Sequence, residues 1–286
     1  MIALFSMRAY RPYRHLRVSV LLLTVLSLGL DDARTQAAEP QSAVVQERIA
    51  RHLELVRIAE QQHRPEEERG VLWAQLGMEY HYSAEFLKAE DAYNKALHLL
   101  KAAPAAKAEY AATLESLASL YLLFSHVDEA ESVRKQALAV RKKLGNSAEI
   151  GFSEINLADV AIARHQYKKA ERLSMLGMEE MESSSSPPRT GILSALITVT
   201  YARCLRGRCG EGLASAQQAL AFAKSKFEPE SAAVGFALGA LGFAEWKTGA
   251  LEDGEKAMRR SIQIMRTTLV SADPRLAAAM QNMRTI

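Results

Sequence analysis

The stretch WAQLGMEYHYSAEFLKAEDAYNKA, residues 73–96, decides the fold. Apolar residues recur at helical spacing on both sides of the short segment 81–86, as in two helices joined by a tight turn. Gly77, Ala89 and Ala96 stand one, thirteen and twenty residues after the apolar Leu76. Small residues at such positions let two helix axes approach to about 8 to 10 Å, so they mark where the helices cross.

The same arrangement returns four more times along the chain. Its apolar anchors are spaced by 41, 40, 42 and 42 residues: Leu76, Leu117, Leu157, Val199 and Leu241. Thirteen of the fifteen residues at the three offsets are Gly or Ala, whereas those types make up 62 of 286 residues overall, which would give about three. The sequence therefore predicts five helix–turn–helix units, at about residues 70–110, 111–150, 151–192, 193–234 and 235–276.

The first unit resembles the tetratricopeptide signature through eight residues: Trp73, Leu76, Gly77, Tyr80, Ala89, Tyr93, Ala96 and Pro104. The second unit matches less fully because Arg134 replaces the usual aromatic residue, and the next two carry Glu154, Ala161 and Arg203 where bulky residues are usual. The long period is similar to that of kinesin light chains. The resemblance implies an all-α, right-handed α-solenoid over residues 70–286, which binds other proteins and is not an enzyme.

Additional helices are expected to cover both ends of the array, because a terminal repeat otherwise exposes an apolar face. A capping segment at residues 39–69 contains an amphipathic helix from about residue 42 to 62, and residues 274–286 form a second cap. The expected apolar stripe of the first helix is Val45, Ile49, Leu53, Val56 and Ile58. The Ser/Pro-rich run 183–188 is expected to be an exposed loop within the array.

The first 38 residues are typical of a secretory signal peptide. Four arginines at positions 8, 11, 14 and 17 precede the apolar stretch 18–30, and small residues follow near Ala38. Thirteen residues span roughly 20 Å as a helix, less than the hydrocarbon core of about 30 Å. We therefore expect an exported protein, periplasmic or secreted. A membrane-anchored assembly factor that keeps this segment is the alternative, and only in that case would the chain contact a membrane.

The net positive charge of the chain belongs to this leader. Removal of residues 1–38 takes away five basic and two acidic residues and leaves 31 of each sign. A chain without excess positive charge is a poor candidate for binding nucleic acid. The expected partner is therefore another polypeptide.

Motifs for catalysis, metal binding or cofactor binding are absent from the sequence: there is no zinc-binding histidine pair, phosphate-binding glycine loop or nucleophile turn. We predict no catalytic residue, no metal and no small-molecule cofactor. Glu115 and Asp159 are the one exception to consider, because both should face the inner groove from neighbouring units and two opposed carboxylates can do acid–base chemistry. A groove-based hydrolase is the less favoured alternative.

Cys204 and Cys209 are the two cysteines of the chain, and they flank the turn of the fourth unit. An even cysteine number in an exported protein favours a disulfide. Two buried, unpaired thiols are the alternative.

In a tetratricopeptide array the first helices line the concave face. The residues expected to form a partner-binding groove there are Met78, Tyr82, Phe152, Ile155, Tyr201, Phe236, Phe243 and Trp246. All eight are apolar or aromatic, and the inward positions carry no basic cluster of the kind that grips chaperone tails. We therefore expect the groove to hold an apolar helix or an extended segment. Exposure is expected for Phe236, Phe243 and Trp246, whereas Phe152 and Ile155 could equally be buried in the scaffold.

Overall fold

A computed structural model describes residues 41–269 and 273–283, which form twelve helices and no strand. The expected leader lies outside these described residues. Helix α2 (Gln41–Gln61) comes first and α13 (Pro274–Met283) last. The five pairs between them are α3 (Glu66–Tyr82) and α4 (Phe86–Ala102), α5 (Lys107–Leu123) and α6 (Val127–Leu144), α7 (Ser147–Ala163) and α8 (Tyr167–Glu182), α9 (Arg189–Leu205) and α10 (Cys209–Lys226), and α11 (Ala232–Thr248) and α12 (Leu251–Thr268).

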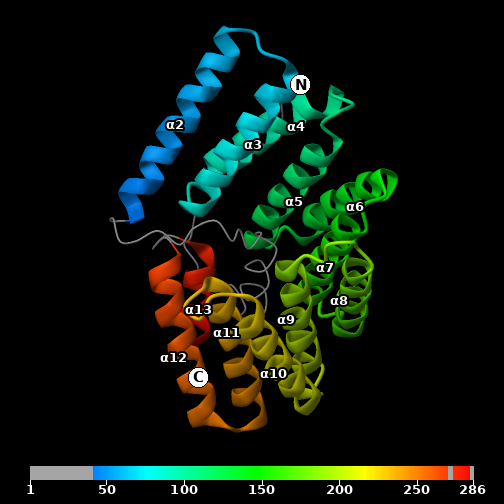
Figure 1. The fold of residues 1–286 in the computed structure, drawn as a ribbon, viewed down its shortest axis with the longest axis vertical. Helices are drawn as coiled ribbons and strands as arrows, with labels where there is room; N and C mark the ends of the chain where they lie inside the picture. The colour runs from blue at the N-terminus through cyan, green and yellow to red at the C-terminus, as the bar shows by residue number, and fades with distance from the viewer. Residues whose placement is uncertain (1–40, 270–272, 284–286) are drawn as a thin grey trace.

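The predicted all-α solenoid is confirmed. Each first helix packs on its own second helix, and each second helix packs on the first helix of the next pair. In Figure 1 the pairs follow a curved path from α2 at the top, through α6–α8 on the right, to α12 at the lower left, with α13 beside it. The first helix of each pair begins three or four residues before the expected start of its unit.

The small residues of the repeat lie where the helices cross, and all fifteen are buried. A Cβ atom added to Gly77 would lie 2.7 Å from the ring of Tyr93. One added to Gly177 would lie 2.5 Å from the carbonyl oxygen of Gly151, and one added to Gly242 would lie 2.7 Å from the backbone of Gly254. The helices of these pairs are therefore as close as their backbones allow.

The turns inside the five pairs share one backbone geometry. Eight residues after each anchor stands a residue with positive φ: Ala84 (62°), Ser125 (62°), His165 (59°), Gly207 (87°) and Gly249 (91°). The next amide donates a hydrogen bond of 2.7 to 2.9 Å to a carbonyl five residues earlier, as in a Schellman motif. Three of the five turns thus place a residue with a side chain in a conformation that favours glycine.

Helix α2 covers α3, but not with the expected stripe. Val45, Ile49 and Val56 are buried, whereas Leu53 is exposed and Ile58 is only half-buried. Ala59 is fully buried instead. The expected stripe is therefore wrong at these two positions, and it left out Ala59, which is buried.

The Gly177→Ala substitution is expected to lower the free energy of unfolding by about 2 kcal/mol. The new Cβ would meet the Gly151 carbonyl oxygen, which belongs to the backbone and cannot rotate away. Urea unfolding followed by circular dichroism measures the loss. The control is Gly210→Ala in α10, where an added Cβ has no atom within 4 Å; it should be neutral or stabilising by up to about 1 kcal/mol. Equal losses in the two variants would contradict the tight crossing.

The Ser125→Gly substitution is expected to raise the free energy of unfolding by about 1 kcal/mol, because Ser125 is exposed and has a φ of 62°. Gly249→Ala introduces a side chain at the matching turn, where φ is 91°, and should have the opposite effect. Thermal unfolding of both variants gives the comparison. No loss of stability in Gly249→Ala would show that the turns tolerate side chains.

Candidate functional site

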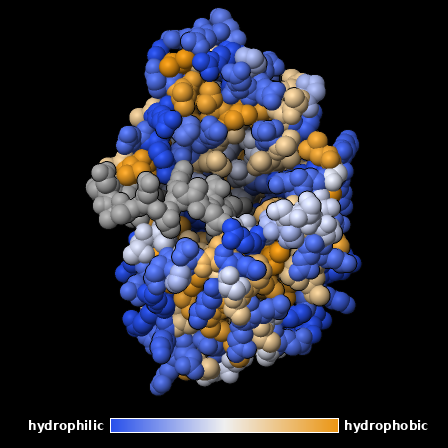
Figure 2. Space-filling view, viewed as in Figure 1, coloured by the Kyte–Doolittle hydropathy of each residue, from blue (hydrophilic) through white to orange (hydrophobic). Residues whose placement is uncertain are grey.

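The eight expected groove residues lie in different environments. Met78 is 37% exposed, and Tyr82, Phe152 and Trp246 are half-buried. The other four are at most 4% exposed and belong to the core: Ile155, Tyr201, Phe236 and Phe243. The expected exposure of Phe236 and Phe243 is therefore wrong. Figure 2 shows apolar side chains gathered in the upper half of the molecule and again in the lower half.

Helix α13 contributes to the burial of Tyr201 and Phe236. It packs on α12, the last helix of the array, and it also reaches residues of the first helices α9 and α11. Ala278 of α13 lines a cavity of about 40 Å³ together with Tyr201 of α9, Phe236 of α11 and Met265 of α12. Deeper in the same face, the rings of Tyr201 and Phe243 are 5.0 Å apart. The aromatic surface near the last unit is thus covered by the chain's own C-terminal helix.

Arg275, at the start of α13, joins the first and last units. Its guanidinium lies 5.3 Å from the ring centre of Tyr82 in α3 and 5.5 Å from that of Phe236 in α11. It also pairs with Asp273, with 2.8 Å between Nη2 and Oδ2. Beside them, burial lowers the pKa of His81 to about 4, the nearby Asp273 acting in the opposite direction. His81 is therefore uncharged at neutral pH and does not repel the guanidinium.

One aromatic edge of the first-helix face stays accessible. Trp246 is half-buried and contacts Phe243, with 6.3 Å between ring centres. The ammonium of Lys247 lies 4.7 Å from the Trp246 ring centre. A cation over an aromatic ring makes a favourable but modest interaction at exposed sites. Trp246 and Met78 are thus the expected groove residues that a partner can reach with least rearrangement.

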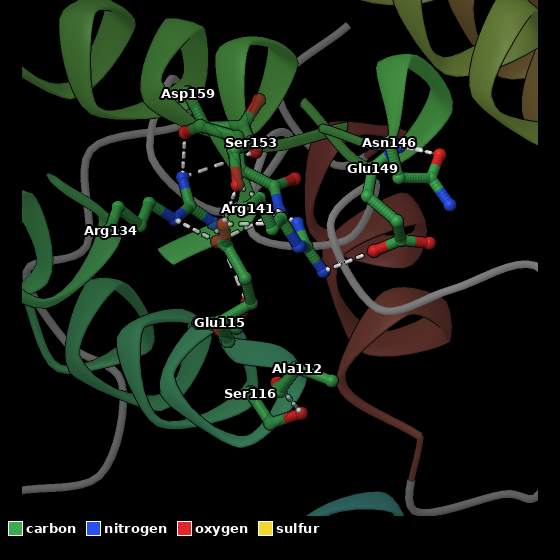
Figure 3. Close-up of polar contacts among 11 residues, drawn as sticks. Ala112, Glu115, Ser116, Arg134, Arg141, Asn146, Glu149, Ser153 and Asp159 are labelled. Carbon is green, nitrogen blue, oxygen red and sulfur yellow. Dashed lines mark hydrogen bonds and ion pairs between the residues drawn. The ribbon is translucent and has the colours of Figure 1, made fainter. Parts of the chain in front are cut away.

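Glu115 and Asp159 do not face an open groove. They are 5% and 1% exposed, and both point into a buried polar network between α5, α6 and α7 (Figure 3). Glu115 accepts hydrogen bonds from Ser153 at 2.7 Å and from Asn156 at 2.9 Å. Carboxylates that are enclosed in this way cannot reach a substrate. The groove-based hydrolase, which depended on them, therefore loses its candidate residues.

Two arginines of α6 hold this network together, and sequence reasoning missed their role. Arg134 is fully buried; its guanidinium lies 3.6 Å from Glu115 and 3.5 Å from Asp159, and it donates to the carbonyl of Asn156. Arg141 pairs with Glu115 at 3.3 Å and with Glu149 at 2.9 Å. A usable signal was present: arginines seven residues apart share one helix face, and the first replaces the usual aromatic residue.

Asp159 is the least well-paired member of the network. Its Oδ1 accepts no hydrogen bond from the described residues. Burial, together with the neighbouring Glu115 and against the attraction of Arg134, raises the pKa of Asp159 to about 7. The charges of Arg134 and Arg141 are already balanced by Glu115 and Glu149, so the network is neutral when Asp159 is protonated.

The turn of the fourth unit carries a disulfide and a cluster of arginines. Cys204 and Cys209 are bonded, with an S–S distance of 2.11 Å. Around this turn, Glu171 of α8 pairs with three arginines, at 2.8, 3.1 and 3.5 Å: Arg203, Arg206 and Arg208. The disulfide thus links the two helices of the weakly matching fourth unit, and the ion pairs with Glu171 link this unit to the third.

The part of the chain that the structure describes contains neither a metal-binding cluster nor a membrane-spanning helix. No group of three or more His, Cys, Asp or Glu residues there could hold a metal ion. None of the helices described is both long and apolar enough to cross a membrane.

No family model and no curated protein matches the chain. Several solved structures are similar to it in fold. BtubC (BKLC) from P. vanneervenii is similar with a TM-score of 0.61 and 18% identity, over 77% of this chain and 90% of that one. A putative kinesin light chain of Podosopora anserina with TPR-like repeats gives 0.51 and 16%, over 68% and 93%. A Rap protein complexed with Competence and Sporulation Factor gives 0.59 and 16%, over 87% and 70%. At these identities the likeness shows the fold, which is that of tetratricopeptide repeats.

The pH dependence of stability should reveal the protonation of Asp159. A carboxyl group with a raised pKa binds its proton more tightly in the folded state, so the folded state loses stability as the pH rises from about 4 to about 7. Asp159→Asn removes this dependence. Between pH 5 and 7.5 the wild type should therefore lose about 2 kcal/mol more than the variant.

Urea unfolding at several pH values measures this difference. Asp253→Asn, which removes an exposed carboxyl group from α12, is the control and should follow the wild type. Parallel pH profiles for wild type and Asp159→Asn would contradict the assignment.

Proposed function

We propose that this chain is an exported scaffold that holds a second polypeptide against the face formed by its first helices. The position of α13 carries the proposal: its first turn places Arg275 beside both Tyr82 of the first unit and Phe236 of the last, and Ala278 lines a cavity with Tyr201 and Phe236. The face therefore accepts a helix. The similar Rap structure supports a polypeptide partner, because that protein is complexed with Competence and Sporulation Factor.

The residues of the face indicate the chemistry of the partner. Tyr201 and Phe236 line the cavity beside α13, and Phe243 contacts Tyr201. Trp246 and Met78 are accessible on the first helices α11 and α3. Aromatic residues that are flanked by a less buried margin are typical of protein-binding surfaces. An apolar helix or extended segment suits this surface better than a strongly acidic tail, since Lys247 is the one basic residue among the expected inward positions.

Export is part of the proposal. The basic and apolar leader at residues 1–38 supports it, and so does the Cys204–Cys209 disulfide, because disulfides persist in oxidising compartments. A membrane-anchored assembly factor that keeps residues 18–30 is the second candidate. N-terminal sequencing of the protein from its native compartment distinguishes the two: a mature chain that begins near residue 39 fits export, and an intact leader in the membrane fraction fits the anchor.

Photo-crosslinking tests the binding face. A photoreactive amino acid at position 78 or 246 is expected to crosslink the same polypeptide in the native compartment, because both side chains are accessible on the first helices. Leu87, which is 69% exposed on the second helix α4, is the control position and should give no such product. Products shared by all three positions, or products from position 87 alone, would contradict binding on this face. Phe243 is unsuitable as a probe because it belongs to the core.

A further inference from the structure

Helix α13 depends on its surroundings for its structure. It has ten residues, and isolated helices of this length are unstable in water. Its start is organised locally: Pro274 occupies the first turn, and Asp273 accepts a hydrogen bond of 2.8 Å from the backbone amide of Arg275. The Asp273 carboxylate also binds the Arg275 guanidinium, at 3.0 Å from Nε and 2.8 Å from Nη2. These contacts hold the guanidinium in one orientation at the end of the helix.

The guanidinium of Arg275 lies near two aromatic rings from opposite ends of the array. Tyr82 belongs to the first unit and Phe236 to the last, yet both ring centres are within 5.5 Å of the guanidinium carbon. Arg275 is only 8% exposed, and the buried His81 beside it is uncharged at neutral pH. Tyr82 and Phe236 thus form a site for an arginine side chain, which is desolvated and surrounded by aromatic surface, the setting in which cation–π interactions are strongest.

The remainder of α13 fits its site less completely. A cavity of about 40 Å³ is left between Ala278 and the side chains of Ile197, Tyr201 and Met258. Ala278 is 2% exposed and lines this cavity. Unfilled apolar volume weakens packing, and an occupant that fills 40 Å³ should bind about fivefold more tightly.

We propose that α13 is a resident occupant of the partner site, and that the partner is a helix with an arginine in its first turn and a larger apolar residue in place of Ala278. Such a helix puts its arginine between Tyr82 and Phe236 and fills the cavity, so it displaces α13. The inference rests on the proposed function and deepens it. It specifies which residues the partner helix needs, and it implies that α13 occupies the site when no partner is bound.

A labelled peptide tests this with the full chain. The probe is a fluorescein-labelled peptide of residues 273–283, and binding is measured by fluorescence anisotropy. In the wild-type chain α13 competes at the high effective concentration of a tethered segment. The Arg275→Ala chain, whose own α13 is weakened, is expected to bind the peptide roughly tenfold more tightly than the wild type. Arg266→Ala, which removes an exposed arginine from α12, is the matched control and should bind as the wild type does.

Two variant peptides test the chemistry of the occupant. A peptide with Ala278→Leu should bind the Arg275→Ala chain about fivefold more tightly than the native peptide, and one with Arg275→Ala should bind roughly tenfold more weakly. Equal binding of the native and arginine-free peptides would overturn the proposal. So would a folded Arg275→Ala chain that binds no better than the wild type. The proposal would also be overturned if the Arg275→Ala chain formed a dimer that excess peptide did not dissociate, because the site would then bind a second copy of the chain.

Hydrogen exchange provides a readout that does not depend on a stable variant chain. In the wild type, saturating Ala278→Leu peptide should accelerate exchange of the amides of residues 275–283 as α13 leaves its site. Unchanged exchange at saturation would overturn the proposal. The peptide measurements need no natural partner. If the peptide displaces α13 but photo-crosslinking at positions 78 and 246 fails, the proposed function alone is contradicted. If photo-crosslinking succeeds but the peptide does not displace α13, the role of α13 as a resident occupant alone is contradicted.

Discussion

The solenoid depends on how closely the two helices of each unit approach. At Gly177 an added Cβ would lie 2.5 Å from the opposing carbonyl oxygen of Gly151, and at Gly254 one would lie 2.9 Å from that of Gly242. Because backbone meets backbone, there is no side chain that could rotate to make room. The close pairs stack with a regular offset, and their first helices form one continuous face. Tyr82 and Phe236 owe their positions on that face to these crossings.

Features that depend on one unit could be predicted from the sequence, and features that depend on distant units could not. The crossing residues and the helix pairs follow from spacing within about 40 residues, which is why five units gave the correct fold although some of them match the signature weakly. The accessibility of Phe236 depends on where α13 packs. No local pattern indicates that Arg275 reaches Tyr82, since the two residues come from opposite ends of the array. The burial of Ala59 was missed for a different reason: a stripe drawn from large apolar residues overlooks a small one.

The buried network shows what happens when a repeat departs from its own pattern. A phenyl or phenol ring at position 134 could pack alone, but the guanidinium of Arg134 requires Glu115 from its own unit and Asp159 from the next. Desolvation of such groups costs much of what their attraction contributes, so the network adds little stability compared with apolar packing. It does require particular neighbours. A shifted pairing of helices would leave Arg134 buried without a counter-ion, which makes the network a determinant of how units two and three are joined.

The contact of Arg275 with both Tyr82 and Phe236 changes the mechanics of the array. In an open solenoid each unit contacts its neighbours alone, so curvature is the sum of local angles at successive interfaces. A side chain that binds the first and last units together adds a constraint that no neighbouring pair supplies. A segment that replaces α13 either keeps or loses this link between the first and last units, so its binding can change the curvature of the array. Because such coupling is reciprocal, a change in curvature also changes the affinity of the site for that segment. Binding of a segment to the face and the curvature of the solenoid are therefore thermodynamically coupled.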